Sequence, residues 1–424
     1  MTRHRIIRHA LLAVGALATL GVAAARAQQA ENRIAADLAY LAADARQGRG
    51  VGTVGLDSAA AYLAAAFARA GLQPPAGQDG YFQTFTIDPG AAAAAHAGAG
   101  GQRVKNVVGV LPGRGPLAEQ VVVVGAHYDH LGLGGFASLD PDSVGVVHNG
   151  ADDNGSGTVG LLEIARQLAR RQAENARTLI LIAFTGEELG LLGSDYYVKH
   201  PVVPIDKTVA MVNLDMVGRL QNDRVTVFGT QTATEFAALL DSLRATRGLT
   251  IAGSGDGYGR SDQSSFFAAD VPVLHFFTGT HEDYHRASDD ADKINVAGIA
   301  RIAELASDVA WTLATRKPAL TFVDAEPPAP VAGGGYGAYL GTIPDMSESP
   351  GGVRLTGVRA GSPAEAAGVQ KGDIIVQIGE HDVKDLYQMT DALRAYKPGD
   401  SVIVAVMRDG KRLELSATLS SRGG

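Results

Sequence analysis

The chain has 424 residues, of which 46% are hydrophobic and none is cysteine. That length allows two or three domains, and the lack of cysteine excludes disulfides and thiolate metal ligands. The net charge is −8, and subtracting the four arginines among the first 27 residues leaves −12 for the rest. Binding of phosphate backbones requires a basic surface, so nucleic acid is not expected as the main partner.

The N-terminus has the pattern of a secretory signal. Arg3, Arg5 and Arg8 precede an apolar stretch at 10–24, and Ala25-Arg26-Ala27 supplies the small residues of a cleavage site. The alternative is an uncleaved membrane anchor, but the stretch is shorter than the roughly 20 apolar residues that usually span a bilayer. We expect a signal peptide at 1–27, a periplasmic or secreted protein, and no membrane span after cleavage.

The central part of the chain alternates between strand-like and helix-like patterns. Helical spacing occurs at 34–45, 58–70, 158–171 and 234–244. Strongly apolar runs typical of buried strands lie at 107–110, 121–124, 178–184, 209–214 and 271–277. This alternation predicts an α/β fold with a mixed, mostly parallel sheet flanked by helices, in a domain that we place at 28–316. Ligands in such folds tend to lie beyond the carboxyl ends of the strands.

The composition changes after this region. Residues 317–335 are rich in proline and glycine, which is typical of an interdomain linker. Beyond the linker, strands are expected at 353–358, 373–379 and 401–407, and helices at 362–367 and 385–395. These short elements predict a small β-rich domain of α+β type at 336–424.

Acidic and histidine-bearing motifs follow several of the apolar runs. In chain order they are His127-Tyr-Asp129, Asp152-Asp153-Asn154, Glu187-Glu188, Asp215 and Tyr284-His285. Taken singly, each has an ordinary structural explanation, such as a polar residue at a strand end or an acidic turn. Taken together, they provide the nitrogen and oxygen donors for two divalent cations, which suits zinc, manganese or cobalt. A second glutamate beside a ligand is what metal-assisted hydrolysis needs as a base.

A single-zinc protease is a competing interpretation. His281-Glu-Asp-Tyr-His285 spells H-E-x-x-H, and Glu304 lies downstream where a third ligand could stand. That motif requires a helix, so that both histidines share one face. The flanking residues show no long amphipathic pattern, and the four upstream motifs would have no role. We therefore favour the two-metal hydrolase.

The segments GAHYDHLG, NGADDNGSG, FTGEELGLLGS, NLDMVG and DYHRASDDADKI resemble the twenty-eighth family of metallopeptidases, over roughly Glu31 to Thr312. The resemblance implies a co-catalytic di-zinc exopeptidase, related to secreted bacterial aminopeptidases and to glutamate carboxypeptidase. It implies two Zn²⁺ per chain, for which Mn²⁺ or Co²⁺ could substitute. The implied ligands are His127 and Asp215 for one metal, Glu188 and His285 for the other, and Asp152 as the bridge.

The resemblance also implies roles around the metals. Glu187 would act as the general base, Asp129 would orient His127, and Tyr284 would hydrogen-bond the oxyanion. A cis peptide is expected between Asp152 and Asp153. The chain departs from the family pattern at Gln263, often histidine, and at Asp290, often threonine, which puts substrate details in doubt. His130 and His148 are expected to be supporting or surface residues.

The C-terminal domain resembles a PDZ domain of periplasmic proteases. Tyr339-Leu340-Gly341-Thr342 matches its carboxylate-binding loop, and the stretches at 361–369 and 371–375 match its most recognisable sequence. The resemblance implies that this loop captures a peptide terminus while the peptide adds a strand. A purely stabilising domain is the alternative.

The resulting functional prediction is an exported zinc aminopeptidase that acts on peptides or proteins. Zinc ligands do not reveal which end of the substrate is held, so a carboxypeptidase or dipeptidase with the same chemistry stays open. Arg219, Arg260 and Arg286 lie near the motifs and could receive a substrate carboxylate. From another class, a catalytically silent PDZ peptide-binding protein is the remaining alternative.

Overall fold

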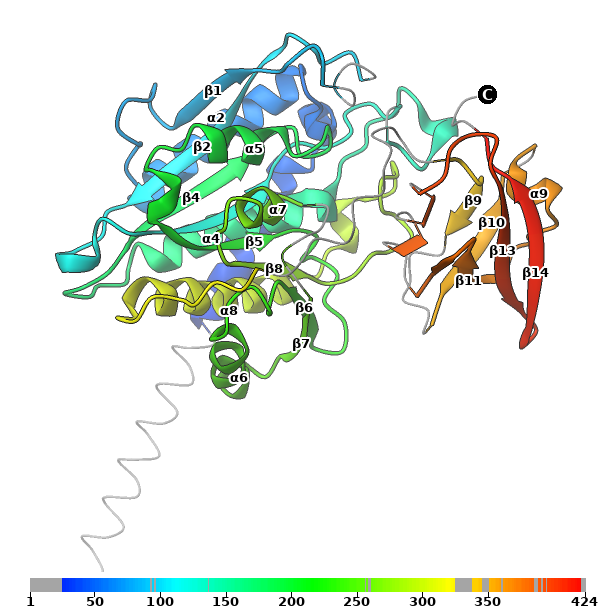
Figure 1. The fold of residues 1–424 in the computed structure, drawn as a ribbon. Coiled ribbons are helices and arrows are strands. Elements are labelled where there is room, and N and C mark those ends of the chain that lie inside the picture. The colour runs from blue at the N-terminus through cyan, green and yellow to red at the C-terminus, as the bar shows by residue number, and fades with distance from the viewer. Residues whose placement is uncertain are drawn as a thin grey trace, which may run out of the picture. The chain divides into compact units, whose positions relative to one another are not determined.

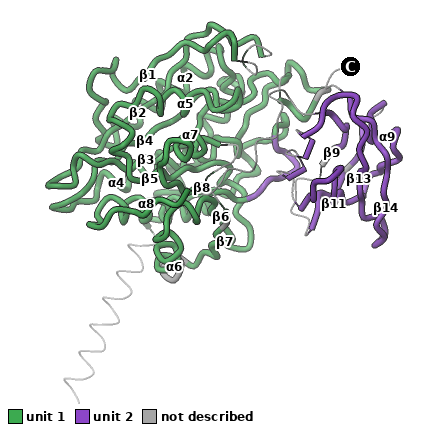
Figure 2. Tube along the Cα trace, in the orientation of Figure 1, with its two compact units in different colours: residues 1–278, 285–325 green, residues 279–284, 326–424 purple. Residues whose placement is uncertain are grey.

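The computed structural model describes residues 25–420, apart from 92–93, 95–96, 136, 256, 258–260, 325–337, 345–350, 360, 385–387, 390–391 and 394. The predicted signal segment up to residue 24, the linker from residue 325 and part of the predicted helix at 385–395 lie outside these residues. The chain divides into two compact units, one of residues 1–278 and 285–325 and the other of residues 279–284 and 326–424 (Figure 2). The predicted domain boundaries therefore stay predictions.

The first unit is built on an eight-stranded mixed sheet with the order β1-β2-β4-β3-β5-β8-β6-β7 (Figure 1). The strands are β1 (Phe82–Thr86), β2 (Arg103–Leu111), β3 (Val121–His127), β4 (Thr178–Phe184), β5 (Thr208–Leu214), β6 (Arg224–Phe228), β7 (Thr250–Ser254) and β8 (Val273–Phe277). Strands β4, β3, β5 and β8 are mutually parallel neighbours, which confirms the α/β prediction.

Helices cover both faces of this sheet, which explains why the central strands are almost continuously apolar. The helices are residues 25–41, α2 (Val54–Ala70), α4 (Gly157–Leu168), α5 (Leu192–Lys199), α6 (Phe236–Arg247), α7 (Gln263–Phe267) and α8 (Val296–Thr315). Val122 and Val124 of β3 pack with α2, α4 and α8. Val121 and Val123, on the opposite face of the same strand, pack with α5 and α7.

Short helical turns connect the larger elements. They are η1 (Asp44–Arg49), η2 (Gly115–Leu117), η3 (Pro141–Ser143), η4 (Ala151–Ser156), η5 (Ile205–Lys207) and η6 (Ala291–Lys293). Turn η4 runs directly into α4 and carries the acidic motif at 152–153. No helix in the described part of the chain is long and apolar enough to cross a bilayer.

The second unit contains an antiparallel sheet with the order β14-β13-β11-β10-β9, and β12 pairs with β11. Its elements are β9 (Thr342–Pro344), β10 (Val353–Val358), α9 (Pro363–Ala366), β11 (Ile374–Ile378), β12 (His381–Asp382), β13 (Ser401–Arg408) and β14 (Lys411–Thr418). Leu355, Ile375, Val404 and Val406 form part of a separate core. The predicted strands at 353–358, 373–379 and 401–407 are confirmed, whereas β9, β12 and β14 were not anticipated.

A buried carboxylate anchors this small core. Asp373 is 1% exposed at its side chain. It accepts hydrogen bonds from Arg408 Nε and Nη2, both at 2.7 Å, and from the Gln370 backbone at 2.9 Å. Burial opposes ionisation, but these donors outweigh it and lower the pKa of Asp373. The ion pair therefore stabilises the second unit when the carboxylate is charged.

We expect Asp373→Asn to destabilise the second unit by about 2 kcal/mol, because the guanidinium loses its charged partner. Amide hydrogen exchange of β11 and β13 in the full chain measures the effect. The carboxylate's contribution is complete above its unfolded pKa of about 3.9 and is lost as the pH falls through the lower folded value. Glu414→Gln is the control, since Glu414 lies 3.8 Å from Arg412 in an exposed pair. Equal effects of the two substitutions would contradict the anchoring role.

Candidate metal centre

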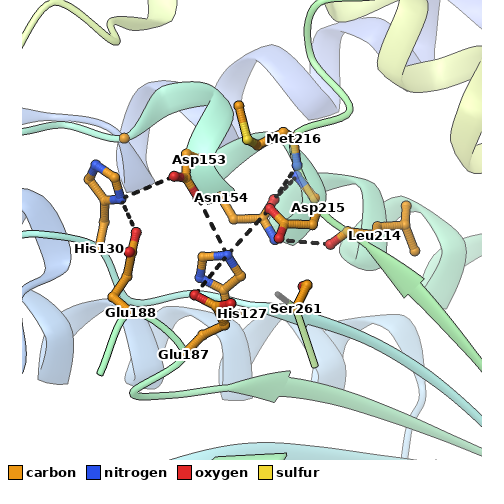
Figure 3. A network of polar contacts seen from close by, with 12 residues as sticks. His127, His130, Asp153, Asn154, Glu187, Glu188, Leu214, Asp215, Met216 and Ser261 are labelled. Atoms are coloured by element: carbon orange, nitrogen blue, oxygen red, sulfur yellow. Dashed lines mark hydrogen bonds and ion pairs between the residues drawn. The ribbon is translucent and has the colours of Figure 1, made fainter. Parts of the chain in front are cut away.

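The topology brings the predicted motifs to one edge of the first sheet. His127 is the last residue of β3, Asp215 follows β5, and Glu187 and Glu188 follow β4 after a two-residue turn. Because β4, β3 and β5 are adjacent and parallel, their carboxyl ends lie at the same edge. Turn η4 adds Asp153 to this group, and Figure 3 shows these side chains converging.

One group of potential ligands consists of His127, Asp153 and Asp215. His127 Nε2 lies 3.4 Å from Asp153 Oδ1 and 3.3 Å from Asp215 Oδ1. Neither His127 Nε2 nor Asp215 Oδ1 has a hydrogen-bond partner in the described part of the chain, although both atoms are buried. A buried nitrogen and two carboxylate oxygens facing one another are a suitable donor set for a divalent cation.

A second group shares Asp153 and adds Glu188 with two histidines. His285 Nε2 lies 3.2 Å from Asp153 Oδ2 and 3.1 Å from Glu188 Oε2. His130 Nδ1 lies 2.7 Å from Glu188 Oε1 and 4.0 Å from Asp153 Oδ2. His130, Asp153 and Glu188 therefore also offer three donors close together. His130 contacts a predicted ligand directly, as a supporting residue would, and it also lies close enough to be a donor itself.

Backbone carbonyls orient the two predicted histidine ligands. His127 Nδ1 donates to Asp129 O at 3.2 Å, and His285 Nδ1 donates to Ala137 O at 2.9 Å. Each bond leaves Nε2 directed at the carboxylates, which is how ligating imidazoles are usually held. The Asp129 carboxylate lies 3.8 Å from His127 Nδ1, so the contact with His127 is made mainly through the backbone.

The prediction for the shared carboxylate needs correction. Asp153, and not Asp152, presents one oxygen to His127 and the other to His285. The Asp152 carboxylate instead accepts a 2.6 Å hydrogen bond from Gly218 N. Side chains of successive residues diverge, so only one of the two aspartates can face both histidines. The cis peptide is likewise Asp153–Asn154 and not Asp152–Asp153.

Two further polar residues fix the acidic turn. Asp289 Oδ2 accepts from the backbone nitrogens of Asp152 and Asp153 at 2.9 and 3.0 Å. Asn154 donates to Leu214 O at 2.9 Å and accepts from Met216 N at 3.2 Å, so its side chain is hydrogen-bonded to the backbone on both sides of Asp215. The positions of Asp153 and Asp215 are thereby coupled through one amide side chain.

Glu187 lies beside the first group of potential ligands but is not one of them. Its Oε2 lies 3.9 Å from His127 Nε2, and its backbone nitrogen donates to Asp129 Oδ1 at 3.2 Å. Burial, together with the neighbouring Glu188 and Asp215, raises the pKa of Glu187 well above its ordinary value, although His127 opposes this. A carboxyl group with a raised pKa is suited to exchanging protons.

The other carboxylates behave differently. Burial opposes their ionisation, but His285 and His130 lower the pKa of Glu188 to about 2. The neighbouring His127 and His285 likewise lower the pKa of Asp153. The adjacent residues Glu187 and Glu188 are thus pushed in opposite directions, one toward proton exchange and the other toward permanent negative charge.

The alternative motifs do not form the structures that they would need. Residues 281–285 lie in turns and not in a helix, so the H-E-x-x-H spelling does not place both histidines on one helical face.

The other residues singled out from the sequence lie around the candidate centre or outside the described residues. Tyr284 is half-buried beside His285. His148 Nε2 lies 2.9 Å from Ser138 Oγ, within the loop that holds His285. Arg219 donates to Asp289 at 3.1 Å, and Arg260 lies outside the described residues.

Sequence reasoning missed the residues that hold the backbone around the candidate ligands. Arg49 is buried behind the acidic turn, and no motif pointed to it. Asn154 and Asp289 were quoted within motifs but received no structural role. These residues stand out because they are polar and fully buried, and burial of a single polar residue cannot be read from one sequence.

Both units of the chain are similar to known protein families. Residues 106–310 match the profile described as peptidase family M28, and residues 338–419 match that of the PDZ domain. Aminopeptidase YwaD of Bacillus subtilis is 29% identical over 224 residues, covering 48% of this chain and 43% of the relative. The chain spans about half the length of the curated relatives it matches.

Solved structures share the fold. BSAP, a zinc aminopeptidase from Bacillus subtilis, superposes with a TM-score of 0.52 at 18% identity, over 68% of this chain and 95% of that one. Glutaminyl cyclase of Porphyromonas gingivalis gives 0.52 at 20% identity, over 66% and 96%. The first unit therefore has the zinc aminopeptidase fold. The chain contains a peptidase family M28 domain followed by a PDZ domain.

Proposed function

We propose that this protein is an exported, zinc-dependent aminopeptidase that hydrolyses N-terminal peptide bonds. The observation that carries the proposal is the Asp153 carboxylate, whose two oxygens face His127 and His285 separately. His127 and Asp215 would hold one zinc ion, Glu188 and His285 the other, and Asp153 would bridge them. His130 is placed to support Glu188 or to add a donor on its side.

The donor set fits zinc. His127 Nε2 and Asp215 Oδ1 are buried without hydrogen-bond partners among the described residues, and imidazole and carboxylate are ordinary zinc ligands. Zinc bound there would supply Lewis acidity for the scissile carbonyl and for the attacking water. Without a cation, several carboxylates would lie close together in a buried site, an arrangement that is costly unless positive charge compensates it.

Glu187 is the proposed general base. Its side chain is 9% exposed and lies beside His127, and its raised pKa keeps it able to accept a proton and release it again. It would take a proton from the attacking water and deliver it to the departing amine. The Asp129 carboxylate holds the Glu187 backbone at 3.2 Å and fixes the base relative to β3. Tyr284 is proposed to hydrogen-bond the oxyanion.

Two observations favour an aminopeptidase over a carboxypeptidase. Further carboxyl groups, Asp129 and Asp262, lie within electrostatic range of His127 and favour an ammonium group over a carboxylate at the site. Arg219, a predicted receptor for a substrate carboxylate, is paired with Asp289. The curated relative YwaD is itself named an aminopeptidase.

A paired substrate panel tests the proposal. Zinc-loaded protein of residues 28–424 is expected to cleave leucyl-nitroanilide and to lose nearly all activity when the substrate amine is acetylated. Removal of zinc with a chelator should abolish turnover, and added Zn²⁺ should restore it. Equal cleavage of free and acetylated substrates would contradict an aminopeptidase. Release of C-terminal residues from blocked peptides would favour the carboxypeptidase.

The PDZ domain is proposed to bind a peptide terminus. Leu340 and Gly341 are buried at the start of the domain, where their carbonyls accept from Ala364 N and Arg359 N, each at 2.8 Å. Tyr339 pairs with Ser420 through both backbone groups. These contacts fix the loop at 339–342, so that a peptide terminus would meet a rigid backbone and not a mobile one.

A further inference from the structure

Arg49 is a buried cation that touches the backbone of three separate segments. It is 1% exposed. Nε donates to Tyr128 O at 2.8 Å, Nη2 donates to Gly150 O at 2.8 Å, and Nη1 donates to Asn149 O at 2.7 Å and to Leu41 O at 2.9 Å. All of its partners are backbone carbonyls, so the guanidinium keeps its charge uncompensated by any bonded carboxylate.

The positions of these carbonyls are informative. Tyr128 lies between His127 and Asp129, directly after β3, and residues 149 and 150 lead into the turn that carries Asp153. The backbone of η1 reinforces the tie, because His130 N donates to Arg49 O at 3.2 Å and Gly132 N donates to Gly48 O at 3.1 Å. One side chain thus joins the segment holding His127 and His130 to the segment holding Asp153.

Turn η1 packs closely against the segments around residues 132 and 149. Gly48 has a φ of 56°, and a Cβ on it would lie 2.3 Å from Gly132 O. Asn149 adds side-chain bonds of 2.9 Å to Asp44 and to Asp290. The guanidinium also lies in the field of the acidic cluster. Burial lowers the pKa of Arg49 to about 10, and Asp129 and Asp289 oppose that shift, so it is charged at neutral pH.

We infer that Arg49 is a positioning residue for the metal centre: it holds the His127 and Asp153 segments at ligating distance and offsets the negative charge of the carboxylates. This inference rests on the proposed metal site. It extends the site to a residue that precedes the region matched by the peptidase family, at 106–310. Pre-assembly of ligands by such supporting contacts typically changes metal affinity about 10–100-fold when it is lost.

The test is a zinc titration of the full mature chain against a competing chelator, with the Co²⁺ absorption spectrum as a second readout. Arg49→Lys keeps the charge but cannot donate to four carbonyls at once. We expect its zinc affinity to fall at least tenfold and its Co²⁺ spectrum to change.

Arg177→Lys is the matched control. Arg177 is 2% exposed and donates to Gln120 Oε1 at 2.7 Å, Leu313 O at 2.8 Å and Arg316 O at 2.5 Å, next to the end of α8. Its substitution should lower thermal stability while leaving zinc affinity and the Co²⁺ spectrum unchanged. A general loss of stability would affect both variants alike.

The outcomes separate the inference from the proposed function. Zinc affinity of Arg49→Lys within twofold of the wild type would overturn the positioning role alone. Absence of zinc binding in the wild type would overturn the metal site and the inference with it. If Arg49→Lys is too unstable at the standard temperature, both variants are titrated below its unfolding transition, and zinc affinity of Arg49→Lys equal to that of Arg177→Lys there would overturn the inference.

Discussion

Asp153→Asn is expected to strip zinc from both positions of the candidate centre and to lower kcat/KM by about 10⁴-fold or more. The physical reason is that Asp153 serves both groups, with Oδ1 at 3.4 Å from His127 and Oδ2 at 3.2 Å from His285. An amide has one oxygen and no charge, so it cannot replace a bridging carboxylate. Zinc content per chain and steady-state hydrolysis measure the effect.

Asp152→Asn is the matched control for this experiment. Asp152 accepts from Gly218 N through Oδ1, and an asparagine oxygen could accept the same bond. Zinc content should therefore stay near that of the wild type and activity within about tenfold of it. The reverse result, with Asp152→Asn losing both metals and Asp153→Asn retaining them, would restore the assignment made from the sequence.

Glu187→Gln is expected to lower kcat about 10³-fold while zinc content and thermal stability stay unchanged. Glutamine preserves the size of the side chain and the backbone bond to Asp129, but it cannot accept a proton. Because Glu187 is 3.9 Å from His127 and is not needed to complete either ligand group, metal binding should survive. Single-turnover rates and zinc analysis separate the two effects.

Glu188→Gln provides the contrast on the neighbouring position. Its carboxylate contacts His130 at 2.7 Å and His285 at 3.1 Å, so its loss should reduce zinc content as well as rate. Full activity of Glu187→Gln would exclude it as the base. Loss of metal in Glu187→Gln would show instead that this glutamate is a ligand.

The sequence predicted the central fold because its signals were local and strong. The runs at 121–124, 178–184 and 209–214 became β3, β4 and β5, since strands buried on both faces are apolar throughout. Strands β1, β6 and β7 were missed. They are short and mix polar with apolar residues, and their identity depends on pairing with distant strands. Such pairing leaves little trace in a single segment.

The sequence predicted which segments meet at the candidate site, but not which of two adjacent aspartates faces the histidines. Strand ends located His127, Glu188 and Asp215 correctly at one edge of the sheet. Adjacent aspartates were beyond that reasoning, because the choice between Asp152 and Asp153 depends on the backbone path through η4 and on a hydrogen bond to Gly218. Arg49 was beyond it too, since its partners are carbonyls that any residue could supply.

The order of the proposed ligands along the chain has a consequence for how the proposed activity would arise. The first histidine is residue 127 and the last is residue 285, and between them lie five strands of the same sheet, β4 to β8, several of which pair with strands distant in the sequence. A growing or truncated chain therefore lacks a complete set of donors until residue 285 is present and the parallel strands have docked. Hydrolytic capacity would arise late, with the finished architecture, and no early fragment would possess it.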